Sequence, residues 1–222
     1  MGTSNWQNIS YNIDLVRRLN PKTILDVGVG FGRWGILFRE YLDVWEHGQN
    51  RINWKTEIDG IEIYPGYINE YHSYFYNTIY IEDALAHLRN QDKHYDLINL
   101  GDVVEHYKKK DGKELVELSL KHGRYVLINI PIGKHWGQKG TAENPYEEHK
   151  STWYNSDFTG YKHYVIECFR DFMQRDFSVV LISSGRIVFD KTQGKYFGIK
   201  NFLKHRVGFK KTIENFERRK SK

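Results

Sequence analysis

The sequence lacks the usual features of a secreted or membrane-inserted protein. It has one cysteine, Cys168, which cannot form a disulfide within the chain. No apolar segment of the kind found in signal peptides follows Met1. No apolar run approaches the roughly 20 residues needed to span a bilayer, and the longest are strand-like runs such as 125–132. We therefore expect a cytoplasmic protein without a transmembrane helix.

The sequence also lacks an even distribution of charge. Its formal net charge is +5, yet residues 200–222 carry nine Lys or Arg and two Glu, so that residues 1–199 have a net charge of −2. Binding of nucleic acid or a membrane by a basic surface on this nearly neutral body is therefore not supported. Any attraction to polyanions would come from the C-terminal segment.

The length of 222 residues and the hydrophobic content of 40% suit one well-buried domain with appendages. We expect that domain over residues 1–198 and a basic amphipathic tail over 199–222. In the tail, apolar residues can share one face of a helix: Ile199, Phe202, Phe209, Ile213 and Phe216. This face can pack against the domain or against a second copy in a homodimer, and the tail can instead contact phosphates or an anionic membrane.

Apolar runs alternate with helical patterns along the chain, which predicts an α/β fold with a doubly wound, mostly parallel sheet of seven strands. Helices are expected over 9–19, 33–41 and 113–121. The last two strands should include an antiparallel strand at the sheet edge. The expected strands are 23–27, 58–63, 79–81, 95–100, 125–130, 164–169 and 177–183. Residues 132–161, rich in glycine, aromatic and polar side chains, are expected to form a substrate loop.

A glycine-rich segment, Asp26-Val27-Gly28-Val29-Gly30-Phe31-Gly32, lies between the first strand and the next helix. Glycines allow a sharp turn and close approach of a ligand, and ligands of open α/β sheets bind beyond the carboxyl ends of the strands. The helix start behind the turn offers N–H groups to a carboxylate or phosphate. The dinucleotide fingerprint requires a third glycine where this chain has Arg33, which weakens an NAD(P)-dependent interpretation but leaves it open.

Acidic residues follow the later strands, and together with the glycine turn they resemble the class I S-adenosylmethionine (SAM)-dependent methyltransferases over roughly residues 23–131. The motifs that carry the resemblance are 26–32, Glu62, Asp83 and Asp102-Val103-Val104-Glu105-His106. It implies a Rossmann-like fold and SAM as cofactor, with Glu62 at the ribose and Asp83 at the adenine. The methionine portion would lie near Asp26, Gly28 and Gly30. Neighbouring positions complete the expected site, namely Gly32, Ile63, Ala84 and Asp102, with Arg33 inferred to pair with the methionine carboxylate.

Methyl transfer is an in-line displacement, so the protein mainly aligns the reactants and supplies a base when the acceptor is a hydroxyl. His106 follows the fourth strand and resembles the His of a Glu-His pair found in many small-molecule members of the family. The loop segment Asn144-Pro145-Tyr146-Glu147-Glu148-His149-Lys150-Ser151-Thr152-Trp153 resembles a bacterial methyltransferase group of mostly unassigned substrate. We take His106 and His149 as candidate bases and Glu148 as an orienting acid. Alternatively, His106 only bonds backbone, and the loop is pinned by its own hydrogen bonds.

Two other chemistries are weakly supported. The Asn144-Pro145-Tyr146 run lacks the second proline of the DNA amino-methyltransferase motif and follows the fifth strand instead of the fourth, so base methylation loses its main support. No pair of histidines has the His-x-x-x-His spacing of a zinc motif, and we expect no required metal.

The loop aromatics suit stacking on sugar or aromatic rings, unless they cover the sheet edge: Trp136, Tyr146, Trp153, Tyr154, Phe158 and Tyr161. A small-molecule or glycan hydroxyl is the acceptor we expect. Two alternatives remain, an NAD(P)-dependent oxidoreductase and a non-catalytic SAM-binding interaction module.

Overall fold

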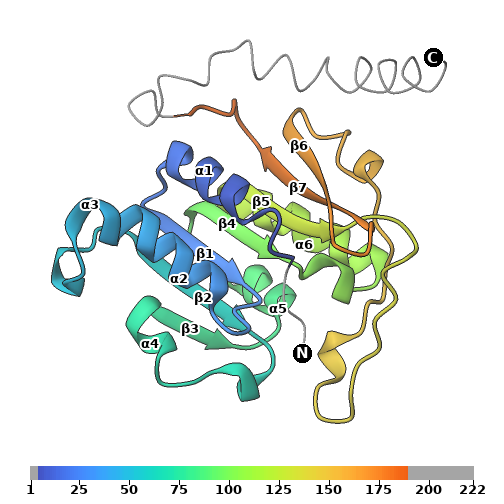
Figure 1. The fold of residues 1–222 in the computed structure, drawn as a ribbon, viewed down its shortest axis with the longest axis horizontal. Coiled ribbons are helices and arrows are strands. Elements are labelled where there is room, and N and C mark those ends of the chain that lie inside the picture. The colour runs from blue at the N-terminus through green and yellow to red at the C-terminus, as the bar shows by residue number, and fades with distance from the viewer. Residues whose placement is uncertain (1–4, 190–222) are drawn as a thin grey trace. The chain divides into compact units, whose positions relative to one another are not determined.

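The structure, a computed structural model, describes residues 5–189; the expected domain boundary at 198/199 and the basic tail lie outside this range. Its centre is a seven-stranded sheet in the order β3-β2-β1-β4-β5-β7-β6 (Figure 1). Strand β7 runs antiparallel to β5 and β6, and the other neighbouring strands are parallel. The predicted fold class is therefore confirmed. The strands are β1 (Thr23–Val27), β2 (Glu57–Glu62), β3 (Thr78–Ile81), β4 (Tyr95–Gly101), β5 (Gly123–Pro131), β6 (His163–Arg170) and β7 (Asp176–Ser183).

Helices cover both faces of this sheet. Helices α1 (Ile9–Leu19) and α2 (Arg33–Arg39) lie on one face, and α5 (Ala84–Asn90) and α6 (Lys109–His122) lie on the other (Figure 1). On the α5 and α6 side, apolar residues of the central strands pack against Leu88 and Leu115 in one buried cluster. The inner strands β1, β4, β5 and β7 are mostly apolar because they are buried on both faces, whereas the edge strands β3 and β6 are only partly buried.

The helix expected over 33–41 extends further than the sequence indicated. It continues through a π-helical turn (Glu40–Val44) into α3 (Trp45–His47). A buried ion pair holds this extension, with Arg39 Nη1 2.6 Å from Asp43 Oδ2. The same guanidinium donates to the carbonyl of Thr56, and Asp43 accepts from the amide of Lys55. The connection to β2 is thereby folded onto the helix.

Three further helical segments depart from the sequence interpretation. The short helix α4 (His72–Phe75) and helix α5 were not expected, and α6 begins at Lys109 instead of Lys113. Within residues 5–189, no helix has both the length and the apolar composition that crossing a membrane would require.

The carboxyl ends of β1, β2, β3 and β4 meet along one edge of the sheet, since these strands are parallel neighbours. Between β5 and β6 the chain forms a long loop with two 3-10 turns (Pro145–Glu147 and Asn155–Asp157). This loop is tied back to the sheet by a bridge between Ile132 and Trp153. The expected ligand-binding edge and the expected substrate loop therefore belong to one end of the sheet.

Candidate functional site

The glycine turn after β1 is held in a conformation that requires glycine. Gly28, Gly30 and Gly32 have φ of 77°, 52° and 87°, and a Cβ on Gly28 would collide with the side chain of Val103. The amide of Gly28 donates to the carbonyl of Ile61 at 2.8 Å, and the amide of Gly30 donates to Glu62 Oε2 at 2.8 Å. These N–H groups are therefore used to fix the turn to β2, unlike those of a loop that cradles a diphosphate.

Asp26 lies buried behind this turn and does not line the cavity. The prediction that it contacts a cofactor directly is therefore corrected. Its side chain is buried, with Oδ2 accepting from the Tyr76 hydroxyl at 2.6 Å and Oδ1 accepting from Asn99 Nδ2 at 2.8 Å. Burial raises the pKa of Asp26 to about 7, although the hydrogen bonds from Tyr76 and Asn99 lower it. Sequence reasoning missed both partners. Asn99 could have been noticed in the sequence, because it is a polar side chain within an apolar strand.

The carboxylates after β2 and β3 are held in fixed orientations at the cavity wall. Glu62 Oε1 accepts from the amide of Tyr64 at 2.8 Å, opposite the bond from Gly30, and burial raises the pKa of Glu62. Asp83 caps α5 by accepting from the amide of Ala86 at 3.0 Å, and it accepts from the Tyr107 hydroxyl at 2.8 Å. Each carboxylate keeps lone pairs for a ligand.

These residues border one cavity of about 1040 Å³ at the carboxyl ends of the strands. Ten of the predicted site residues line it, namely Gly28, Gly30, Arg33, Glu62, Ile63, Asp83, Ala84, Asp102, His106 and His149. Asp26, Gly32 and Glu148 do not. Gly32 acts in the turn itself, where a Cβ would lie 3.0 Å from the ring of His72.

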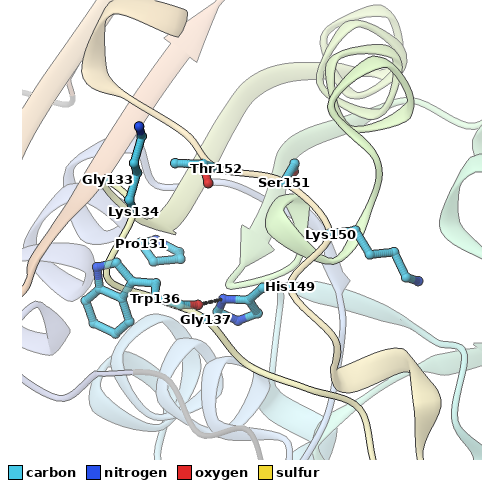
Figure 2. Close-up of a pocket in the computed structure, with 9 residues that line it drawn as sticks. All are labelled: Pro131, Gly133, Lys134, Trp136, Gly137, His149, Lys150, Ser151 and Thr152. Carbon is cyan, nitrogen blue, oxygen red and sulfur yellow. Dashed lines mark hydrogen bonds between the residues drawn. The ribbon is translucent and has the colours of Figure 1, made fainter.

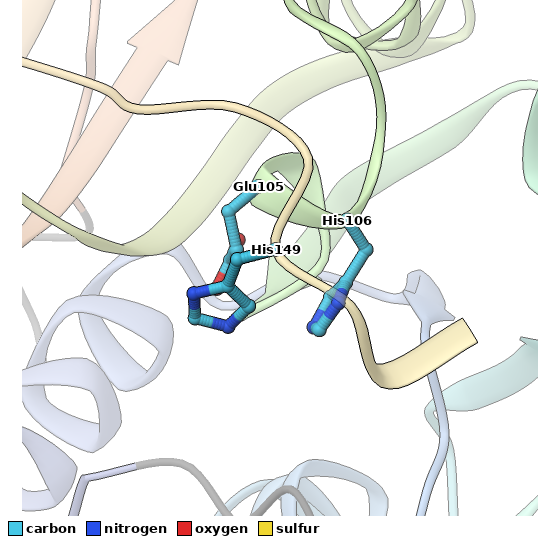
Figure 3. A group of neighbouring side chains, drawn as sticks. All are labelled: Glu105, His106 and His149. Carbon is cyan, nitrogen blue, oxygen red and sulfur yellow. The ribbon is translucent and has the colours of Figure 1, made fainter. Parts of the chain in front are cut away.

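In the lining of the same cavity, the structure brings together Glu105, His106 and His149 (Figure 3). One ligand atom from each lies within 4.8 Å of those of the other two, and the two imidazole rings are 4.9 Å apart with an interplanar angle of 77°. His106 Nδ1 lies 3.1 Å from the carbonyl oxygen of Glu148, and His149 Nδ1 lies 2.6 Å from that of Trp136. Since a carbonyl only accepts, each Nδ1 carries the proton and Nε2 remains available.

The surroundings of both imidazoles favour their neutral form. Burial lowers the pKa of His106, and the neighbouring His149 lowers it further. Burial also lowers the pKa of His149. A neutral imidazole with a fixed Nδ1–H can accept a proton or a metal ion at Nε2.

The acid in this group is Glu105, which corrects the assignment of Glu148. The Glu148 side chain is exposed, and only its backbone carbonyl contacts His106. Glu105 is 1% exposed, and burial together with repulsion from Asp102 raises its pKa well above the usual value. Among residues 5–189, its Oε2 has no hydrogen-bond partner.

The backbone of Glu105 also anchors the substrate loop. Its carbonyl accepts from the amides of Lys150 at 2.8 Å and Ser151 at 3.1 Å. The amide of His149 donates to the carbonyl of Gln138 at 3.0 Å. His149 is thus carried to His106 by backbone pairing across a large gap in sequence, which no local motif indicates.

A smaller cavity of about 200 Å³ lies beside His149 (Figure 2). It shares Trp136 and His149 with the larger cavity and adds polar groups from Lys134, Ser151 and Thr152. Figure 2 shows the hydrogen bond from His149 to the Trp136 carbonyl. His149 therefore borders both cavities.

The loop aromatics divide between two roles. Trp136 and Tyr146 line the large cavity. Trp153 and Phe158 are buried and stack on each other at 5.5 Å between ring centroids, so they belong to the core. Tyr67 and Glu147 also line the large cavity, and the Tyr67 hydroxyl donates a hydrogen bond to the Glu147 carboxylate. The sequence did not indicate this contact.

Comparison with known proteins supports the fold. No family model matches the chain, and no curated protein matches its sequence. The structure is similar to the N-terminal domain of EvdMO1 in the presence of SAH and D-fucose, with a TM-score of 0.55 and 12% identity over 82% of this chain and 85% of that chain. It is also similar to magnesium protoporphyrin IX methyltransferase from Synechocystis PCC 6803 with bound SAM, with a TM-score of 0.50 and 13% identity over 80% and 79% of the two chains. At these identities the likeness concerns the fold.

Proposed function

We propose that this chain, which has the fold of the class I SAM-dependent methyltransferases, binds SAM and transfers its methyl group to a hydroxyl of a small molecule or glycan. One observation carries the proposal. A single cavity is lined at successive strand ends by Gly28, Glu62, Asp83 and Asp102, and it continues to His106 and His149. Groups suited to a nucleoside and groups suited to proton removal thus face the same space.

The residues present fit SAM at the strand ends. Glu62 is fixed by two backbone amides, so its remaining lone pairs can accept both hydroxyls of a ribose. Asp83 can accept from an adenine amino group beside the apolar Ile63. The open side of Gly30, where a Cβ would have no atom nearer than 3.9 Å, leaves room for the methionine portion. SAM, when bound, supplies an electrophilic methyl group.

On the acceptor side, the imidazoles are the groups able to take a proton. The neutral rings of His106 and His149 present Nε2 because their Nδ1–H groups are held by backbone carbonyls. A hydroxyl placed between the cluster and the glycine turn can lose its proton to one Nε2 while its oxygen forms the bond to the methyl carbon. The backbone contacts of Glu105 with the loop hold the two imidazoles in place, which supports the proposal because in-line transfer depends on fixed positions of the reacting groups.

Exposed aromatic rings at the mouth of the cavity support a ring-shaped acceptor. Trp6, Phe31 and Phe172 line the cavity while 67%, 71% and 78% of their surfaces are exposed. Such faces stack on sugar or aromatic rings. The EvdMO1 domain, which was crystallised with D-fucose, lends the glycan alternative some support.

The glycine turn argues against a dinucleotide. Its amides at Gly28 and Gly30 are already donated to Ile61 and Glu62, and Arg33 occupies the position of the third fingerprint glycine. A diphosphate would find few free N–H groups there. This disfavours the NAD(P)-dependent alternative.

Transfer of isotope-labelled methyl groups from SAM to nucleotide sugars, glycans and small aromatic hydroxyls tests the proposal. We expect a labelled product with the wild type and a large loss of turnover in His149→Ala, with the affinity for S-adenosylhomocysteine (SAH) retained. Tight SAH binding with no acceptor in any class would favour the non-catalytic module instead.

A further inference from the structure

We infer that Glu105, His106 and His149 form a binding site for one divalent transition-metal ion at the acceptor side of the cavity. The site itself stands on the geometry of these three side chains, and its role in methyl transfer rests on the proposed function. This site departs from the expectation that no metal is required. His106 and His149 lie far apart in the chain and have no motif spacing that would indicate it.

The surroundings of the Glu105 carboxylate favour a bound cation. It is 1% exposed, and its Oε2 has no partner within the described part of the chain. A buried carboxylate oxygen without a partner is costly, and such groups in native proteins are paired or coordinate metals. A cation there would satisfy the orphaned oxygen.

The two imidazoles are oriented as metal-binding histidines are. Each directs Nδ1 to a backbone carbonyl, that of Glu148 for His106 and that of Trp136 for His149. Metal-binding histidines almost always donate their other ring N–H to a carbonyl, a carboxylate or water, which fixes the tautomer and leaves a basic nitrogen for the ion. Figure 3 shows the two rings and the carboxylate gathered at one point.

The distances are compatible with an ion after a small adjustment. The three ligand atoms lie within 4.8 Å of one another. Ligand atoms bonded to one ion at about 2.0–2.2 Å are separated by about 3.0–3.5 Å, so the side chains need to close by roughly 1 Å.

The ligand set indicates the class of metal. Two imidazoles and one carboxylate suit Mn²⁺, Fe²⁺, Co²⁺ or Zn²⁺, whereas Mg²⁺ and Ca²⁺ prefer all-oxygen sites. Three protein ligands leave coordination positions that face the cavity. When His106 and His149 hold an ion through Nε2, they no longer act as bases. An acceptor hydroxyl bound to that ion would have a lowered pKa and would release its proton to solvent. The oxygen then bonds to the methyl carbon, and the sulfur keeps the electron pair of the broken C–S bond.

Metal titration of the untagged full-length protein, stripped with a chelator and free of cofactor, tests the site. We expect calorimetry with Mn²⁺ and with Zn²⁺ to give about one bound ion per chain. Glu105→Gln and His149→Ala should each weaken binding at least about tenfold, since even outer-shell changes cost 10–100-fold. The matched controls are Glu143→Gln and His135→Ala, because both residues are exposed in the same loop. Both controls should bind as the wild type does.

SAH titration of every variant separates the outcomes. Absence of metal binding in the wild type, or equal binding in the cluster variants, overturns the site. If His149→Ala loses SAH binding because it misfolds, His106→Gln answers the same question. Metal binding without any methyl transfer leaves the site standing and removes the proposed function. Undiminished transfer by stripped protein in chelator overturns the metal's role and returns proton removal to the imidazoles.

Discussion

Removing one buried hydroxyl tests how the glycine turn is supported. In Tyr76→Phe the ring and its packing remain, but two hydrogen bonds are lost. The hydroxyl donates to Asp26 Oδ2 at 2.6 Å and accepts from the amide of Gly35 at 3.1 Å. Gly35 lies in the first turn of α2, where an amide has no partner within the helix. The variant therefore leaves a buried donor and a buried acceptor unsatisfied.

The loss of stability expected in Tyr76→Phe depends on pH because Asp26 titrates. Burial raises its pKa to about 7, so the carboxyl is charged in the folded protein at pH 8 and protonated at pH 5. A lost hydrogen bond to a charged group costs about 1.5–3 kcal/mol and an unsatisfied amide about 1–2 kcal/mol more, which gives about 3–5 kcal/mol at pH 8. At pH 5 the first contribution falls to about 1 kcal/mol, and the total to about 2–3 kcal/mol.

Urea unfolding of the wild type and of Tyr76→Phe at pH 8 and pH 5 measures the two losses of stability. The wild type itself should lose stability as pH rises from about 4 to about 7. In that window the folded protein retains a proton on Asp26 that the unfolded chain has released. Tyr74→Phe, which changes a half-exposed residue of the neighbouring helix α4, is the matched control and should change stability by less than about 0.5 kcal/mol. A cost in Tyr76→Phe that is equal at both pH values, or larger at pH 5, would refute this reasoning.

Three further predictions concern other buried or corrected residues. Arg39→Ala should destabilise the protein by about 3–5 kcal/mol in urea unfolding, because it leaves the buried Asp43 carboxylate without its ion pair; a cost below about 1 kcal/mol would mean that water replaces the pair. Glu62→Gln should weaken SAH binding at least about tenfold by calorimetry, since one of the two amides that Glu62 accepts from would face an NH₂ group; unchanged affinity would remove Glu62 from the ribose site. In steady-state assays, Glu148→Gln should keep turnover within about twofold of the wild type while Glu105→Gln lowers it at least about tenfold, and the reverse order would restore Glu148 as the orienting acid.

The sheet could be predicted from sequence because its inner strands are buried on both faces and read as apolar runs between turn residues. The ends of the helices could not. The extension of α2 to His47 depends on the pairing of Arg39 and Asp43 with the backbone of Thr56 and Lys55, which are tertiary contacts. A local helical pattern contains no information on such contacts.

The cofactor side of the site was predictable because parallel strands bring their carboxyl ends to one edge, which places Glu62 and Asp83 without further information. The direction of the Asp26 side chain was not, since β1 is buried on both faces. Its partner Tyr76 directly follows the short helix α4, which the sequence did not indicate. On the acceptor side, the glutamate of the Asn-Pro-Tyr-Glu-x-His motif is Glu147, not the predicted Glu148. Glu147 lines the cavity, whereas Glu148 does not.

A calorimetric titration of the wild-type chain with SAH and with NAD⁺ tests the central claim most directly. The account predicts that one SAH binds per chain, that Glu62→Ala abolishes the signal, and that NAD⁺ gives no heat of binding. Binding of NAD⁺ without SAH, or of neither, would contradict the assignment of this cavity to SAM.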